Sequence, residues 1–143
     1  MNQDNIYQMF LRIINEYKYL EFTEEELMEE FMDILAMAVS EVQMQGVCEG
    51  LECDPDFGMS EDVDTQSAYI LAHACALVWV MPKVHSSEML AYALTSTDFT
   101  LFSPANRLQA CMKLKTDMQT KLNNLITDYH SRSVMAALKE DGM

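Results

Sequence analysis

The chain has 143 residues, half of them apolar, with only four glycines and three prolines. This composition argues against a disordered chain, a disulfide scaffold or an all-β sandwich, and the length fits one domain with a modest core. The net charge of −14 is concentrated in residues 1–64, which carry 17 acidic and 2 basic side chains. Because binding to phosphates requires clustered Lys and Arg, a cationic nucleic-acid-binding face is not expected.

Four cysteines, Cys48, Cys53, Cys75 and Cys111, show no tight pairing pattern, and no signal peptide is recognisable. We therefore expect reduced thiols in an intracellular protein. The longest apolar run, residues 68–81, is shorter than the roughly 20 residues that a membrane span needs. It predicts a buried helix, and no membrane association is expected.

Two helices are predicted in the acidic part of the chain. Residues 5–19 carry apolar side chains at three- and four-residue spacings, with Asp4 as the expected cap. A second helix is expected after Thr23, because Thr followed three residues later by Glu26 forms a capping box. Gly46 is its expected end. The solvent face of this helix is strongly acidic, with Glu25, Glu29, Glu30 and Asp33.

Residues 47–64 read as the one clear loop, and its acidic residues raise the question of a calcium site. The EF-hand spacing fails, because Gly58 comes one position early and Thr65 occupies the position of the bidentate Glu. Cys48 and Cys53 lack a second pair of ligands at a spacing suited to zinc. The sequence therefore predicts no metal site here.

A third helix is predicted from about Ser60 to Met81, where Pro82 should stop it. Its second half is apolar on nearly every face, so it is expected to be the central buried helix, with His73 as a hydrogen-bonded core histidine. A short fourth helix is predicted to begin at Ser86 or Ser87 and to run through Leu94.

The strongest pattern is a long C-terminal helix over residues 104–139. Ser103 is a favoured N-cap, Pro104 suits the first helical position, and no Gly or Pro follows until Gly142. The expected apolar stripe comprises Leu108, Cys111, Lys115, Met118, Leu122, Leu125 and Tyr129. A helix of about 50 Å exceeds the diameter of a small domain, so part of it is expected to project or to contact something else.

These elements together predict an all-α fold, a single helical domain of about five helices with a long C-terminal helix. Its segments are an acidic helical pair (1–46), an acidic loop (47–59), a buried central helix with a short helix (60–94), a docking loop (95–103) and the long helix (104–139).

No catalytic set is recognisable in the sequence. Glycine-rich phosphate loops, nucleophile elbows and paired histidines are missing, and His73, His85 and His130 lie on different predicted elements. General acid–base catalysis needs a shielded pocket, whereas the paired carboxylates fall on a helix surface and in a loop. We expect no enzyme activity and no cofactor.

Two stretches resemble small helical neck proteins of tailed bacteriophages, of the head-to-tail connector or head-completion type. The first runs from Thr97-Asp98-Phe99 through Phe102-Ser103-Pro104-Ala105-Asn106-Arg107-Leu108 to the Leu122–Tyr129 helix. The second is Ser60-Glu61-Asp62, followed by Ile70-Leu71-Ala72 and Trp79. The resemblance covers roughly residues 60–132.

This resemblance implies a virion protein of the neck, assembled in the host cytoplasm. It implies a homo-oligomeric ring, of twelve copies by analogy with the family, between the portal protein and a downstream neck or tail protein. DNA would pass through the channel without sequence-specific binding. Residues 98–107 become a docking segment, with these expected interaction residues: Asp98, Phe99, Leu101, Phe102, Asn106 and Arg107.

Two other functions fit the sequence. One is an acidic DNA mimic that inhibits a nucleic-acid enzyme by binding its basic groove, supported by the charge of −15 on residues 1–64. The other is a helical adaptor for a cellular partner.

Overall fold

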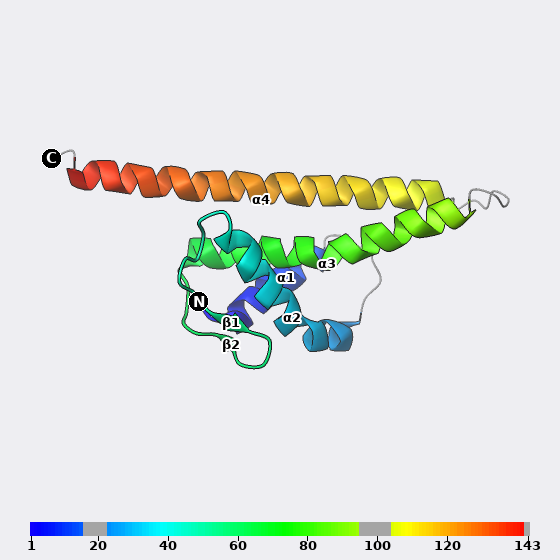
Figure 1. Cartoon of the computed structure of the whole chain (residues 1–143), viewed down its shortest axis with the longest axis horizontal. Coiled ribbons are helices and arrows are strands. Elements are labelled where there is room, and N and C mark those ends of the chain that lie inside the picture. Colours follow the sequence, from blue (N-terminus) through cyan, green and yellow to red (C-terminus); the bar gives the residue numbers. More distant parts are fainter. Residues whose placement is uncertain (16–22, 95–103, 142–143) are drawn as a thin grey trace.

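The computed structural model describes residues 1–15, 23–94 and 104–141. This part of the chain forms four helices and one small two-stranded sheet (Figure 1). In chain order, the elements are α1 (Gln3–Asn15), α2 (Glu24–Gln43), β1 (Cys53–Asp54), β2 (Gly58–Met59), α3 (Thr65–Leu94) and α4 (Pro104–Asp141). The predicted all-α class is confirmed, but the described residues contain four helices where about five were expected.

The helix count differs because α3 continues through Pro82. The predicted stop there, and the separate helix from Ser86 or Ser87, are wrong. Proline inside a helix removes one backbone hydrogen bond and clashes with the preceding turn, which bends a helix without necessarily ending it. The residues after Pro82 include no second proline and no glycine before Leu94. Figure 1 shows α3 changing direction partway along its length.

Helix α3 is the centre of the fold. It contacts α1 and α2 on one side and α4 on the other (Figure 1). Its buried residues are Ala68, Ile70, Leu71, Ala72, Ala74, Cys75, Ala76, Trp79 and Val80. Because alanines alternate with larger side chains around this helix, neighbours can approach it from several directions. The prediction of a central buried helix is confirmed.

An aromatic cluster joins the N-terminal helices to α3. The Phe10 ring lies 6.3 Å from that of Trp79 and 5.8 Å from that of Phe31, which in turn lies 4.9 Å from Tyr7. Such edge-to-face and tilted pairs stabilise a core beyond the area they bury. The cluster therefore fixes α1 and α2 against α3.

The ends of the first two helices are set by local hydrogen bonds. The Thr23 hydroxyl accepts from the Glu26 backbone N–H at 3.3 Å, as the capping pattern predicts. At α1 the expected cap Asp4 is wrong. The Asn2 side-chain oxygen accepts from the N–H of Asn5 at 3.1 Å, and the Asn5 oxygen accepts from the N–H of Asn2 at 3.0 Å. Asp4 instead lies within the first turn.

The loop between α2 and α3 contains a hairpin that the sequence did not indicate. Cys53 pairs with Met59, and Asp54 pairs with Gly58. The N–H of Ser60 donates to the Glu52 carbonyl at 2.8 Å, while its hydroxyl accepts from the Glu52 N–H at 3.1 Å. Because these bonds tie Ser60 to Glu52 across the hairpin, Ser60 is not helical, and α3 begins at Thr65.

Helix α4 lies along α3 with a buried row of Leu114, Met118, Leu122 and Ile126. The predicted stripe included Met118 and Leu122 but missed Leu114 and Ile126. Three other residues of the predicted stripe are half-buried: Lys115, Leu125 and Tyr129. The side chains of its remaining residues, Leu108 and Cys111, lie outside the described part. A row with steps of four drifts around the helix, as expected where two helices cross at an angle.

Candidate functional site

The predicted docking segment is not brought together by the described residues. Asp98, Phe99, Leu101 and Phe102 lie outside them. Asn106 and Arg107 fall in the first turns of α4, but their side chains are not part of the description. The candidate surfaces of the described chain are therefore elsewhere, in an acidic pocket and at the far end of α4.

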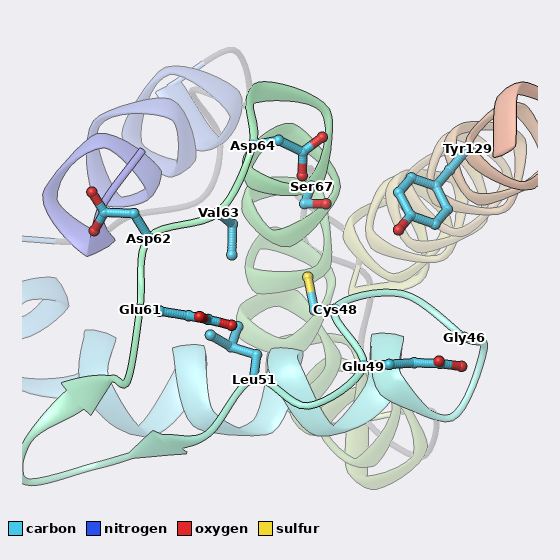
Figure 2. A pocket seen from close by; sticks show the side chains of 10 residues that line it. All are labelled: Gly46, Cys48, Glu49, Leu51, Glu61, Asp62, Val63, Asp64, Ser67 and Tyr129. Atoms are coloured by element: carbon cyan, nitrogen blue, oxygen red, sulfur yellow. The ribbon is translucent and has the colours of Figure 1, made fainter. Parts of the chain in front are cut away.

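The acidic pocket has a volume of about 320 Å³ and lies where the loop after α2 meets the start of α3 and the side of α4 (Figure 2). Its lining residues are Gly46, Cys48, Glu49, Leu51, Glu61, Asp62, Val63, Asp64, Ser67 and Tyr129. Four of them are carboxylates, and all four are exposed to solvent. The sequence indicated this acidic stretch, but not that Ser67 and Tyr129 would join it.

The carboxylates of the pocket do not converge. Figure 2 shows the side chains of Glu61 and Asp62 pointing in opposite directions, and that of Asp64 pointing towards Ser67. Across the described ranges, no three His, Cys, Asp or Glu side chains are placed to share one metal ion. The pocket can attract a cationic group through its field, but the geometry offers no pair of carboxylates set for acid–base work.

Cys48 supplies the thiol at this pocket. Its φ of 57° lies in the left-handed region, which is uncommon for a residue other than glycine. Burial raises the pKa of its thiol, a hydrogen bond with Ser67 partly opposes this, and the nearby Asp64 carboxylate raises the pKa further. A thiol reacts as its thiolate, so at neutral pH Cys48 is poorly suited to nucleophilic catalysis.

The loop beside the pocket is held by two side chains that sequence reasoning missed. The Gln43 amide donates to the carbonyls of Cys48 and Leu51 at 3.0 and 2.6 Å. His130 of α4 places Nε2 2.7 Å from the Gln45 carbonyl, and its ring lies against Gly46, whose φ is +78°. The available signal for Gln43 was a polar side chain in the last turn of the helix, three residues before Gly46. Nothing in the sequence marked His130.

Residues 131–139 near the far end of α4 are exposed on all sides, and we call them the arm. The acidic residues Glu140 and Asp141 follow the arm and end the helix. It carries three large apolar side chains with 57–60% of their surface exposed: Val134, Met135 and Leu138. Arg132 and Lys139 are the charged residues within it. The expectation that part of the long helix projects is confirmed, and Figure 1 shows the C-terminal end of α4 extending beyond the other helices.

No helix in the described residues combines the length and the apolar character required to cross a bilayer. The chain matches no protein-family model, no curated protein and no solved structure in comparisons with known proteins.

Proposed function

We propose that this chain is a structural assembly protein of the head-to-tail connector type in the neck of a tailed bacteriophage. It acts by binding protein partners and not by catalysis. The observation that carries the proposal is the arm of α4, which leaves the body of the fold with its apolar side chains exposed. The resemblance of residues 60–132 to neck proteins supplies the biological setting.

For a protein without a binding partner, exposing the apolar side chains of the arm to water is energetically unfavourable. Burying one Val, Leu or Met side chain is worth about 1.5–3 kcal/mol, and three of them remain in water on consecutive turns. Exposed apolar groups rimmed by charge are typical of surfaces that bind other proteins. A projecting helix also reaches beyond its own domain, which suits a protein that links several copies or components.

In a connector, each copy contacts its neighbours through two different patches, and the ring closes when the rotation between copies closes. The partners of this chain would be other copies of itself, a portal protein and a downstream neck or tail protein. The acidic half would face the channel, where repulsion between like charges keeps passing DNA from adhering. No sequence-specific contact with DNA is needed for this role.

The test combines the purified chain with a portal protein from the same phage, and native mass spectrometry records the complexes. We expect the chain to add to portal rings in a fixed stoichiometry. The variant Phe99→Ala/Phe102→Ala should fold but lose this binding, whereas Met28→Ala/Phe57→Ala removes exposed apolar groups elsewhere and should retain it. A chain that never joins portal rings, from a phage whose particles keep their DNA without it, would reject the proposal.

One observation favours a second function. Every described acidic residue between positions 24 and 64 is exposed, which gives the broad negative surface that a DNA mimic requires. Salt-sensitive binding of the chain to a nucleic-acid enzyme, competed by duplex DNA, would support the mimic. Incorporation of the chain into virions would support the connector.

A further inference from the structure

Helix α2 presents a surface whose chemistry complements the arm. Three- and four-residue steps place one row of exposed residues on the side of α2 that faces away from its buried residues. This row, the outer face of α2, comprises Glu26, Glu30, Asp33, Met37, Glu41 and Met44. Met37 keeps 58% of its surface exposed, and Met28, earlier on α2, keeps 62%. At the centre of the outer face, the exposed Met37 thus has a carboxylate one helical turn to either side, Asp33 and Glu41.

The arm has the opposite arrangement of charge. Arg132, Met135 and Lys139 follow one another at three- and four-residue steps, so the two cations flank the methionine on one side of the helix. Val134 and Leu138 widen the apolar part of this side. The charged ends lie about 10 Å apart along the arm, and Asp33 and Glu41 lie about 12 Å apart along α2. The two surfaces therefore carry opposite charges, in the same order around a methionine and at nearly the same spacing.

We infer that the arm of one copy docks on the outer face of α2 in a second copy of this chain. Arg132 and Lys139 pair with Asp33 and Glu41, while Met135 and Leu138 pack against Met37. The inference rests on the proposed function only in that it names the contact through which a ring of copies would form.

The contact has to lie between two chains. Helix α4 contains no glycine after its start and no proline beyond Pro104, so it has no site at which it could fold back. It also lies on the side of α3 opposite to α2, and its end points away from the body (Figure 1). His130 at the base of the arm touches the loop just after α2, but the straight arm beyond it runs away from the body (Figure 1), so Met135 and Leu138 cannot turn back onto Met37 of their own chain.

The two surfaces are different patches of the same molecule, so the association is head to tail. Each copy that receives an arm still offers its own arm, and the series ends only by closing into a ring. Charge pairs at an exposed interface contribute modestly and are screened by salt. We therefore expect a weak contact between purified copies that becomes weaker at high ionic strength.

The experiment measures the mass of the purified chain by sedimentation from micromolar to millimolar concentration, with four charge variants. Arg132→Glu/Lys139→Glu reverses the arm, and Asp33→Lys/Glu41→Lys reverses the outer face. The third variant combines all four changes. The control, Arg12→Glu/Lys113→Glu, changes the net charge as the arm variant does, at two exposed positions outside both surfaces.

The wild-type chain and the control should associate alike, while each two-residue reversal should weaken association by about tenfold or more. The four-residue reversal should restore it, because both partners have exchanged sign, and so should a mixture of the two separate reversals. All substituted residues are exposed, so circular dichroism should show an unchanged fold.

A wild-type chain that stays monomeric throughout the range overturns the inference, as does an arm reversal that associates like the wild type. Failure of the four-residue reversal to restore association shows that the charges do not act on one another and overturns it as well. A chain that is monomeric alone but joins portal rings would reject this contact and leave the proposed function standing. A chain that associates in this way but never joins a portal would support this contact and reject the proposed function.

Discussion

His73 shows how one residue can make the fold sensitive to pH. It is half-buried on α3, with the Tyr69 ring edge-on at 4.7 Å. It was expected to be a hydrogen-bonded core histidine, but its buried Nε2 has no hydrogen-bond partner among the described residues. Burial lowers the pKa of His73 to about 4, and the positive charge of Lys121 on α4 contributes to the same shift.

The lowered pKa predicts that acid destabilises the fold through this residue. In the unfolded chain the imidazole titrates near 6.5, so above that pH it is neutral in both states and costs nothing. As the pH falls from 6.5 towards 4, only the unfolded chain takes up the proton, and stability is lost. Allowing for partial exposure, the loss is on the order of 2 kcal/mol.

Urea unfolding of the wild type and of His73→Gln at pH 7 and at pH 4 checks this. The variant removes the titrating group and leaves the background of exposed carboxylates in place. The advantage of the wild type over the variant should shrink at pH 4. A difference in unfolding free energy that is the same at both values would contradict the prediction.

The cysteines give a second prediction at the residue scale. Cys75 is fully buried, and burial holds the pKa of its thiol well above the usual range. Cys48 and Cys53 are half-buried, with pKa values that burial also raises. Under native conditions an alkylating reagent should therefore label Cys48 and Cys53 slowly and Cys75 only when the chain unfolds. Peptide mapping by mass spectrometry measures each site separately, and equal labelling of Cys75 and Cys48 would show the prediction to be wrong.

At the scale of elements, the hairpin depends on backbone that only glycine adopts easily. Gly50 and Gly58 both have positive φ, at 82° and 79°. A Cβ at Gly50 would meet open space, whereas a Cβ at Gly58 would overlap the side chain of Gln3. Gln3 in turn accepts a hydrogen bond from the Met59 N–H at 3.2 Å. The two glycines thus share one conformational demand and differ in their surroundings.

This difference predicts unequal costs for the same substitution. Gly50→Ala should destabilise by about 1–2 kcal/mol, the cost of the left-handed conformation. Gly58→Ala should cost about 1 kcal/mol more, because Gln3 must move and release Met59. In a Gln3→Ala background the two substitutions should cost the same. Thermal unfolding of the set measures this, and equal costs in the native background would refute the packing explanation.

Sequence patterns identified helices better than they identified helix ends. Thr23 was a reliable signal because its cap is a local hydrogen bond between neighbours. Pro82 misled because proline disfavours a helix only locally, whereas α3 continues through it to Leu94. The start of α3 was placed too early because Ser60 is hydrogen-bonded to Glu52 on the other side of the hairpin and not to the first turn of a helix. Such contacts between distant residues leave no periodic trace in the sequence.

For the whole molecule, the sequence indicated a helical domain with a projecting C-terminal helix, and the structure agrees. It indicated the acidic loop but not the pocket, because Ser67 and Tyr129 approach that loop only when α3 and α4 pack against it. The interaction residues Asp98, Phe99, Leu101 and Phe102 stay predictions outside the described residues. The exposed row on the arm was not predicted, because the predicted apolar stripe ended at Tyr129.

Helix α4 is continuous from Pro104 to Asp141, so in the proposed contact between copies it would fix the angle between neighbours. His130 of α4 contacts the body, whereas residues 131–139 are exposed. Each residue added after His130 turns the arm by about 100° and advances it by about 1.5 Å. Two alanines inserted after Ser131 would rotate the docking side by about 200°, whereas seven would restore its direction to within about 20° and lengthen the reach by about 10 Å. Self-association should fail with two and return with seven, in assemblies of altered diameter visible by electron microscopy. The number of residues in this one helix would then determine the size of such a ring.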